Sequence, residues 1–286
     1  MRVAIIGANG QLGSELPRAL TQWDVHPLTR PACDLRDFAS VRALLAGIRP
    51  TAVINTAAIT RVDDCESDTQ TAFDVNARAV LNLARVCADL DAALVYLSTD
   101  YVFDGEQRSP YSERDAPNPL SVYGVSKLAG EYFVRNVCAR HLIIRTSGLY
   151  GAAGSRGKGG NFVETMLRLA AGNQAIRVVD DQVLAPTYAR DVAHLIRVLL
   201  EREAGGIFHV TNTGACSWYE FAGKIFDLLG LEPDFDSTTT AAFGAAARRP
   251  AYSVLAHHGL ERCGIDDLRP WSDALKAYLV ETGRLQ

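Results

Sequence analysis

The order of apolar segments in the first half of the chain constrains the fold more than any other feature. Near-continuous apolar runs of strand length, rich in β-branched residues, occupy residues 2–8, 51–58, 92–99 and 141–147. Runs of this kind are typical of parallel strands that are covered on both faces. Between them lie segments with apolar residues three and four positions apart, as in amphipathic helices. Strands that alternate with helices predict right-handed crossovers and an α/β fold with a doubly wound parallel sheet.

After about residue 150 the pattern becomes less regular. A Gly-rich segment at 151–160 precedes a helix expected from Asn161 to Ala171, and one strand expected over 175–187 runs into a turn at Pro186. A helix at 189–201 and a strand at 206–212 then return to the earlier pattern, and the rest is expected to be mainly helical. We therefore expect a smaller, discontinuous C-terminal lobe beside the sheet domain. The expected division is residues 1–150 with a return segment at 188–212 for the sheet domain, and 151–187 with 213–286 for the lobe.

Composition excludes several classes of function. The chain has 286 residues, 48% of them hydrophobic and 22% charged, and a net charge of -4, so it has no electrostatic reason to bind nucleic acid. The N-terminal apolar run is too short for a secretory signal, and no run reaches the roughly 18 residues of a membrane span. The cysteines form no Cys-x-x-Cys pair, which argues against a zinc site and a disulfide framework: Cys33, Cys65, Cys87, Cys138, Cys216 and Cys263. We expect a cytoplasmic protein.

A glycine turn follows the first predicted strand. Gly7, Gly10 and Gly13 stand between that strand and the first helix, where backbone N–H groups and the helix dipole attract a pyrophosphate. The turn predicts a dinucleotide site in a Rossmann-type domain, with Asn9, Gln11 and Leu12 as further cofactor contacts.

A further strand is expected at about Val25 to Thr29, and its end bears on the choice of dinucleotide. Arg30 stands where a carboxylate normally accepts hydrogen bonds from the adenosine ribose, and a cation suits a 2'-phosphate. This favours NADP(H), with NAD(H) possible; the alternative is that Arg30 is only solvated. Asp34 and Leu35 follow at a place where they can meet the adenine.

Tyr123 and Lys127 are four residues apart and would share one face of a helix. An ammonium group favours the phenolate, and lowering the pKa of a phenol by roughly 2 to 3 units needs about 3 to 4 kcal/mol, which one nearby charge can supply. Thr99, at the end of a predicted parallel strand, could hold a carbonyl oxygen. Asn76 could bend a helix and carry a water that connects Lys127 to solvent. The alternatives are a Tyr and a Lys that merely share a helix face, and a helix-interior Asn without a role.

Several longer segments together resemble the extended short-chain dehydrogenase/reductase family, in its dTDP-4-dehydrorhamnose reductase branch, over essentially the whole chain. The matching segments are NTAAITRVDDCE (55–66), STDYVFDG (98–105), YGVSKLAGE (123–131), RTSGLYG (145–151), GNFVETMLRLA (160–170), DDQVLAPT (180–187) and RPAYSVL (249–255). The resemblance implies NADPH-dependent reduction of the C4 ketone of dTDP-4-dehydro-L-rhamnose to dTDP-L-rhamnose. It also implies the catalytic and cofactor-binding roles: Thr99 binds the carbonyl, Tyr123 donates the proton, Lys127 tunes its pKa and anchors the ribose, and Ala57, Ala58 and Thr60 lie along the cofactor.

Differences within the family bear on the substrate. Related 4,6-dehydratases carry Thr-Asp-Glu where this chain has Thr99, Asp100 and Tyr101, so the base for elimination is missing and simple carbonyl reduction remains. Asp100 then either orients a sugar hydroxyl or caps locally. Gly148 replaces a Trp common in the branch, which leaves the exact sugar open. Other candidate substrate contacts in matching segments are Val62, Asn161, Gln182, Thr187 and Arg249, the last for the pyrophosphate.

The resemblance also raises a metal and two alternative functions. Some relatives dimerise through metal-binding carboxylates; Glu15 fits one such position, but Arg190 occupies another, so we expect no bridging metal and either a monomer or a homodimer. One alternative is a reductase of another nucleotide-linked 4-keto-deoxysugar. The other is a non-catalytic, NADP-binding regulatory subunit similar to the β subunit of methionine adenosyltransferase.

Overall fold

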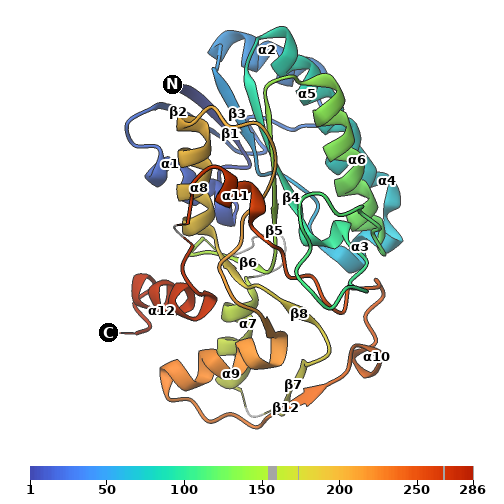
Figure 1. Ribbon diagram of the computed structural model, residues 1–286, viewed down its shortest axis with the longest axis vertical. Helices are drawn as coiled ribbons and strands as arrows, with labels where there is room; N and C mark the ends of the chain where they lie inside the picture. The colour runs from blue at the N-terminus through green and yellow to red at the C-terminus, as the bar shows by residue number, and fades with distance from the viewer. Residues whose placement is uncertain (154–159, 173, 267, 286) are drawn as a thin grey trace.

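A six-stranded parallel sheet forms the centre of the larger part of the molecule (Figure 1). The computed structural model describes residues 1–153, 160–172, 174–266 and 268–285, and its sheet has the order β10-β5-β4-β3-β1-β2 with every neighbouring pair parallel. The strands are β1 (Arg2–Ile6), β2 (Asp24–Leu28), β3 (Ala52–Asn55), β4 (Ala93–Thr99), β5 (His141–Thr146) and β10 (Gly206–His209). The predicted fold class is confirmed.

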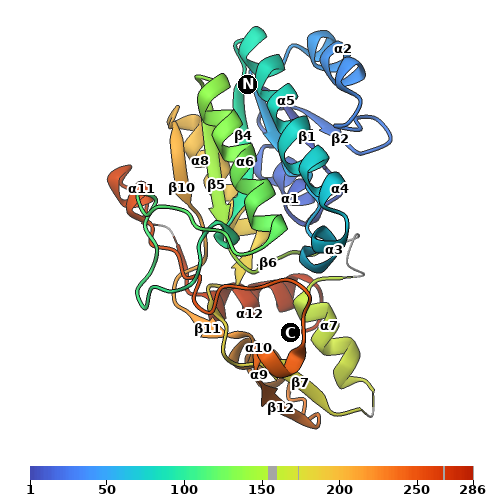
Figure 2. The same ribbon diagram turned by 90° about the vertical axis from the view of Figure 1, so that its right-hand side faces the viewer.

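Helices cover both faces of this sheet, which is why its strands are apolar on both sides. In β1, Val3 and Ile5 belong to one buried cluster, and Ala4 and Ile6 to the other. The first layer of helices consists of α1 (Gln11–Ala19), α8 (Ala189–Glu201) and α11 (His258–Arg262). The second layer consists of α2 (Phe38–Ile48), α5 (Ala79–Asp89) and α6 (Val122–Val137) (Figure 2).

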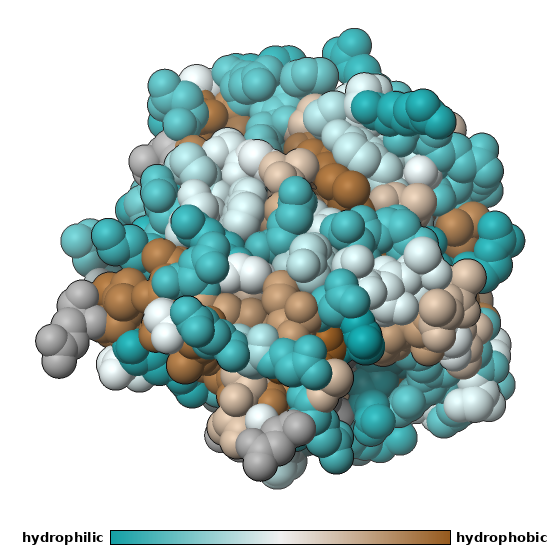
Figure 3. Space-filling view, turned by 90° about the horizontal axis from the view of Figure 1, so that it is seen from below, coloured by the Kyte–Doolittle hydropathy of each residue, from teal (hydrophilic) through white to brown (hydrophobic). Residues whose placement is uncertain are grey.

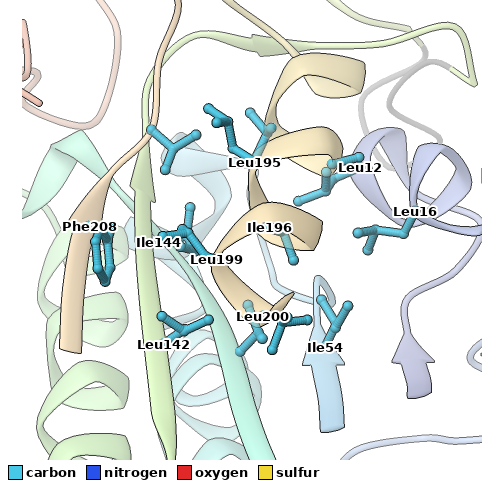
Figure 4. Packing of buried hydrophobic residues seen from close by; sticks show 14 of the residues in the cluster. Leu12, Leu16, Ile54, Leu142, Ile144, Leu195, Ile196, Leu199, Leu200 and Phe208 are labelled. Carbon is cyan, nitrogen blue, oxygen red and sulfur yellow. The ribbon is translucent and has the colours of Figure 1, made fainter. Parts of the chain in front are cut away.

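The first layer shows how the amphipathic pattern becomes a core. Leu12 and Leu16 of α1 and Ile196 of α8 are buried over Ile54 and Ile144 of the sheet (Figure 4). Full burial of each such side chain stabilises the fold by about 1.5 to 3 kcal/mol. This packing holds α1, and with it the glycine turn, against the end of β1.

The helical segment between β3 and β4 is interrupted. It consists of α4 (Thr69–Phe73), a π-helical turn η1 (Asp74–Arg78) and α5. Asn76 lies in this turn: its Oδ1 accepts from the Ile59 N–H at 2.9 Å, and its Nδ2 donates to the Ile59 carbonyl and to Ser126 Oγ, both at 3.1 Å. The widened turn thus carries an amide that binds the loop after β3 and the adjacent helix α6.

The single strand predicted over 175–187 is wrong, because this segment forms β7 (Ile176–Val179), β8 (Val183–Leu184) and β9 (Thr187–Tyr188). Each pairs with a different distant strand: β12 (Phe235–Thr238), β11 (Cys216–Ser217) and β6 (Leu149–Tyr150), respectively. Asp180 accepts from Ser217 Oγ at 2.5 Å, and Asp181 accepts from the Thr240 N–H at 2.8 Å. These polar contacts turn the chain between strands, which local hydrophobicity does not reveal.

The smaller lobe is built around aromatic side chains. Its helices are α7 (Phe162–Ala170), α9 (Trp218–Leu229), α10 (Thr240–Phe243) and α12 (Trp271–Glu281), so the mainly helical C-terminal part also contains β11 and β12. Tyr150, Tyr188, Phe221 and Tyr278 are buried together at its centre. At the lobe end of the molecule, apolar and polar residues are intermingled on the surface (Figure 3). No helix among the described residues is both long and apolar enough to span a bilayer.

The lobe lies beyond the carboxyl ends of β4 and β5 (Figures 1 and 2). Short segments at this edge connect the two parts, including α3 (Val62–Ser67) after β3 and the 3-10 turn η2 (Asp100–Val102) after β4. Ligands of open α/β sheets bind at this edge. Of the predicted Gly-rich loop at 151–160, residues 154–159 lie outside the described part of the chain.

Candidate active site

A cavity of about 590 Å³ lies beside the glycine turn, at the carboxyl ends of β1, β2 and β3; we call it the glycine cleft. Most of the predicted cofactor residues line it: Gly7, Asn9, Gly10, Gln11, Leu12, Arg30, Asp34, Leu35, Ala57, Ala58 and Thr60. Gly13, Tyr123 and Lys127 are not among its lining residues. The structure therefore brings together loops that follow three separate strands.

The start of α1 is suited to a phosphate. Its N-cap is Gly10, which offers no side-chain hydrogen bond, and its first turn has no acidic residue. Gly13 permits the close approach of helix and strand, since a Cβ there would lie 2.1 Å from the Gly7 carbonyl oxygen. The N–H groups of the first turn have no acceptor within the helix, and together with the helix dipole they fit the pyrophosphate of a dinucleotide.

The rim of the glycine cleft carries two cations. The Arg30 side chain is 71% exposed, and its Nε lies 3.6 Å from Asp34 Oδ2. Arg36, which sequence analysis missed, also lines the cleft and binds Asp34 at 2.7 Å, which holds the pKa of that carboxyl well below its usual range. With one carboxylate between two guanidinium groups, this rim keeps a net positive charge, which suits an additional phosphate on the ribose.

A second cavity of about 390 Å³ lies between the end of β4 and the lobe; we call it the tyrosine cavity. Its lining includes Thr99 and Tyr123, together with the predicted substrate contacts Val62, Asp100, Gly148, Asn161 and Gln182. The residues that line both cavities are Gln11, Thr60, Leu97 and Leu149. Ligands held in the two cavities would therefore meet at this shared wall.

Tyr123 enters the tyrosine cavity from the first turn of α6. The helix begins at Ser121, whose Oγ accepts from the Gly124 N–H at 3.2 Å. The Tyr123 ring packs edge-on against Tyr101, with centroids 6.0 Å apart. Burial raises the pKa of the Tyr123 phenol, and the neighbouring Thr99 hydroxyl opposes this effect. The net shift is thus opposite to the lowering expected from Lys127, because desolvation dominates, and the role of Lys127 toward the phenol stays a prediction.

Lys127 lies behind the wall that the two cavities share. Its Nζ donates to the Leu97 carbonyl oxygen at 2.6 Å and lies 4.1 Å from the centroid of the Tyr96 ring. Burial lowers the pKa of Lys127 to about 7, while Glu131 acts in the opposite direction. Neither Lys127 nor Asn76 lines a cavity. Asn76 supports the same helix through Ser126, whose Oγ donates to the Tyr123 carbonyl at 2.8 Å.

The Asp100 carboxylate binds hydroxyl groups from both parts of the molecule. Its Oδ1 accepts from Thr99 Oγ1 at 3.1 Å, and its Oδ2 accepts from Ser147 at 2.7 Å and from Ser253 of the lobe at 2.6 Å. Burial raises the pKa of Asp100, and these hydrogen bonds partly offset the shift. Asp100 therefore binds hydroxyl groups of neighbouring residues, and its role toward a sugar hydroxyl stays a prediction.

Two aromatic residues that sequence analysis did not single out form a wall of the tyrosine cavity. Trp218 and Phe162 both line it, and their ring centroids lie 4.6 Å apart. Gly148 lines the same cavity with φ +52°, and a Cβ there would lie 2.7 Å from Leu184 Cδ1. The aromatic surface is thus supplied by the lobe, while the positive φ of Gly148 disfavours a larger residue at that position.

Arg249 is paired within the protein. Its guanidinium binds Asp63 of α3 at 2.6 and 3.2 Å, and it also donates to the Ala247 carbonyl at 3.0 Å. It does not line the tyrosine cavity, although its neighbour Pro250 does. Its predicted pairing with a pyrophosphate would require it to leave or share Asp63, and this role remains a prediction.

The other predicted polar contacts of the lobe serve its internal structure. Asn161 caps α7 and donates to the Gly151 carbonyl at 3.0 Å. Gln182 Nε2 donates to Thr240 Oγ1 at 2.8 Å. Thr187 is buried, donates to the Ala185 carbonyl at 2.9 Å, and does not line the cavity. Asn161 and Gln182 line it, so only these two are placed to contact a ligand there.

Glu15, on α1, lines neither cavity. It is buried, with Arg18 and Arg190 each 3.7 Å from its Oε2, and burial raises the pKa of its carboxyl. Arg190 also pairs with Glu281 at 3.0 Å. Among the described residues, no group of three His, Cys, Asp or Glu side chains is arranged to hold a metal. Arginine thus surrounds the one carboxylate that resembled a metal ligand.

Some residues of the two cavities that were not predicted could have been found from their positions in the sequence. Tyr101 follows Thr99 and Asp100 directly, and Arg36 follows Asp34 by two positions, so both could have been included by adjacency. Trp218 and Phe162 had no such signal, because each begins an amphipathic helix and reads as an ordinary core residue. Ser253 becomes a site residue only through its contact with Asp100.

Comparison with known proteins gives consistent matches over the whole chain. The family model described as RmlD substrate binding domain matches residues 1–283. The spore coat polysaccharide biosynthesis protein SpsK of Bacillus subtilis strain 168 is 43% identical, covering 98% of this chain and 97% of that protein. The dTDP-4-keto-6-deoxy-D-glucose reductase of Streptomyces niveus is 38% identical, covering 96% and 95%.

A solved structure agrees closely with the fold. The dTDP-4-dehydrorhamnose reductase from Bacillus anthracis strain Ames, in complex with NADP, superimposes with a TM-score of 0.94 at 40% identity. The match covers 98% of this chain and 99% of that one.

Proposed function

The chain belongs to the RmlD family of dTDP-4-dehydrorhamnose reductases, a branch of the extended short-chain dehydrogenases/reductases, and from this we propose that it reduces the C4 ketone of dTDP-4-dehydro-L-rhamnose with NADPH. The product is dTDP-L-rhamnose. One observation carries the proposal: the tyrosine cavity, with Tyr123 and Thr99 in its lining, adjoins the glycine cleft through a shared wall.

The residues of the site divide the chemistry between them. NADPH bound in the glycine cleft would supply the hydride. Tyr123, whose pKa burial raises, gives its phenolic proton to the oxygen of the reduced carbonyl. Thr99 positions that oxygen, and the Lys127 ammonium behind Leu97 stabilises the phenolate that Tyr123 becomes. Elimination of water lacks a base here, because Tyr101 follows Asp100 where dehydratases have Glu.

The charge at the rim of the glycine cleft supports a preference for NADPH over NADH. Arg30 is exposed and contacts Asp34 only at 3.6 Å, so it can turn toward a 2'-phosphate, and Arg36 adds a second cation while neutralising Asp34. Guanidinium groups form strong charge-assisted hydrogen bonds with phosphate. NAD(H) would bind in the same cleft without these contacts and hence more weakly.

The substrate lies in the tyrosine cavity in this proposal. The sugar contacts Val62, Asp100 and Gly148 at its inner end, and the nucleotide extends toward Asn161 and Gln182. Trp218 and Phe162 offer an aromatic surface for the base or sugar. The replacement of Trp by Gly148 and the similarity to a D-glucose-configured reductase support a second candidate substrate, dTDP-4-dehydro-6-deoxy-D-glucose.

The test is NADPH oxidation, followed by absorbance, with each 4-keto sugar nucleotide in turn. We expect the highest kcat/KM with dTDP-4-dehydro-L-rhamnose. A higher kcat/KM with another 4-keto sugar nucleotide would change the assigned substrate but not the assigned reaction, ketone reduction. Absence of oxidation with every ketone, together with co-purification of a methionine adenosyltransferase, would favour the regulatory-subunit alternative.

The remaining assignments form part of the same proposal. Residues 1–150 with 188–212 bind the cofactor, and 151–187 with 213–286 bind the substrate. The protein acts in the cytoplasm as a monomer or homodimer, without a bridging metal. All six cysteines carry free thiols, and five of them are buried, in keeping with a reducing compartment.

A further inference from the structure

A fully buried ion pair joins α6 to β5, one helical turn beyond Lys127. Glu131 of α6 and Arg145 of β5 are each 2% exposed, and their bidentate contacts measure 2.7 and 2.9 Å. A buried pair of this kind is often no more stabilising than apolar side chains of the same size, because both charges must lose their water. Its presence in the core of the sheet domain therefore points to a role other than stability.

The pair is tied to the end of β4. Ser98 Oγ donates to Glu131 Oε1 at 2.5 Å, and Ser98 lies opposite Arg145 in the sheet. Ser98 is flanked by Leu97, whose carbonyl accepts from Lys127, and by Thr99 of the tyrosine cavity. The Glu131 carboxylate thus fixes α6 to β4 at Ser98, which lies between the residue that binds Lys127 and Thr99.

The other end of the pair is closed by a neutral histidine. Arg145 Nη1 lies 3.4 Å from His209 Nε2, while His209 Nδ1 lies 3.1 and 3.0 Å from the carbonyl oxygens of Tyr111 and Ala256. Nδ1 therefore carries the proton, and burial next to Arg145 lowers the pKa of His209 to about 3. Glu131 is left as the counter-ion of Arg145.

Glu131 is also the charged group that acts on Lys127. It follows Lys127 by one turn on the same helix face, and its charge favours the ammonium form. The ring of Tyr96 in β4 lies beneath the Lys127 Nζ, and this phenol is neutral because burial raises its pKa. The adjacent π-helical turn contributes the amide of Asn76.

We propose that Glu131, held by Arg145 and Ser98, is a positioning residue of the active site that keeps the Lys127 ammonium charged and in register with Thr99. Arg145 acts indirectly, because it orients Glu131 and balances its charge. The inference rests on the proposed function, because it assumes that the Lys127 ammonium takes part in the reduction.

The experiment compares Glu131→Gln with wild type in two pH series: kcat/KM for the ketone and the dissociation constant of NADPH measured by fluorescence. Without the anion, Lys127 loses its proton at lower pH. As Lys127 anchors the cofactor ribose in the proposed function, we expect the alkaline fall in kcat/KM and the alkaline rise in the NADPH dissociation constant to begin about one pH unit or more lower than in wild type. NADPH binding is measured without the ketone, so an error in the substrate assignment leaves this readout intact.

The double variant Glu131→Gln/Arg145→Met separates positioning from stability. The single variant leaves Arg145 buried and uncompensated, which is strongly destabilising, whereas the double variant removes both charges. We expect the double variant to unfold at higher urea concentration than the single variant and to keep the pH shift. Asp191→Asn, which breaks a different pair with Arg269, controls for general destabilisation and should leave the pH profile unchanged.

Either of two results would overturn the proposal. The first is a pH profile of folded Glu131→Gln that superimposes on wild type. The second is a shift of the pH profile that is seen in Glu131→Gln but not in the more stable double variant. That result would mean that the ion pair has only a structural role.

Discussion

Replacement of Tyr123 by Phe is the most direct perturbation of the proposed site. It removes one hydroxyl from the tyrosine cavity and leaves the ring, which packs edge-on against Tyr101 at 6.0 Å, in place. Thr99 keeps its hydrogen bonds to Asp100 and to the Tyr101 N–H. The variant should therefore fold normally and differ from wild type in its chemistry.

The size of the effect follows from the role of the phenol. A positioned proton donor contributes about 10²- to 10⁴-fold to a rate, which corresponds to about 3 to 5 kcal/mol of barrier at 1.36 kcal/mol per tenfold. The loss should fall on kcat. Stability should change by about 1 kcal/mol or less, since at most one hydrogen bond of the hydroxyl is lost. NADPH affinity should be nearly unchanged, because Tyr123 does not line the glycine cleft.

The assay follows NADPH absorbance with the enzymatically generated ketone, and fluorescence titration measures NADPH binding separately. Tyr101→Phe is the matched control, since it removes a hydroxyl from the neighbouring ring in the same cavity. We expect it to raise KM and to leave kcat within about tenfold of wild type. If Tyr123→Phe retained full turnover, or if the two variants lost turnover equally, Tyr123 would not be the proton donor.

Three further predictions address the cofactor, the substrate and acid stability. Arg30→Asp should lower the kcat/KM ratio of NADPH to NADH by about 10- to 100-fold, since one charge-assisted hydrogen bond contributes about 1.5 to 3 kcal/mol; an unchanged ratio would mean that Arg30 is only solvated. Trp218→Ala should raise KM for the sugar nucleotide by about tenfold or more with little change in kcat, and an unaltered KM would remove the aromatic wall from the binding site. His257 is half-buried, and the loss of water lowers its pKa to about 4. Below the unfolded value of about 6.5 the unfolded state therefore binds more protons, and the free energy of unfolding falls as the pH falls. Between about pH 7 and pH 5 the free energy of unfolding, measured with urea, should therefore fall by about 2 kcal/mol less in His257→Gln than in wild type. An equal fall in both proteins would contradict this role of His257.

Local patterns were enough to predict the sheet and most of the residues that line the glycine cleft. Apolar runs and helical spacing act over a few neighbouring residues, and β-α-β units leave little choice of topology once their order is known. The glycine turn could be placed at the start of α1 for the same reason: Gly7, Gly10 and Gly13 act through backbone geometry that depends on their own positions. The four-residue spacing of Tyr123 and Lys127 likewise determines that they share one turn of α6.

Long-range contacts and burial were decided only by the tertiary structure. The three strands of 176–188 each depend on a partner more than 30 residues away. Trp218 reaches the cavity because the lobe folds back over the edge of the sheet, and Glu131 meets Arg145 and Ser98 because α6 packs on β4 and β5. Even the sign of the Tyr123 pKa shift depends on this packing. Spacing alone brings a cation near the phenol and predicts a lower pKa, whereas the removal of water from both groups is a property of the whole fold and outweighs it.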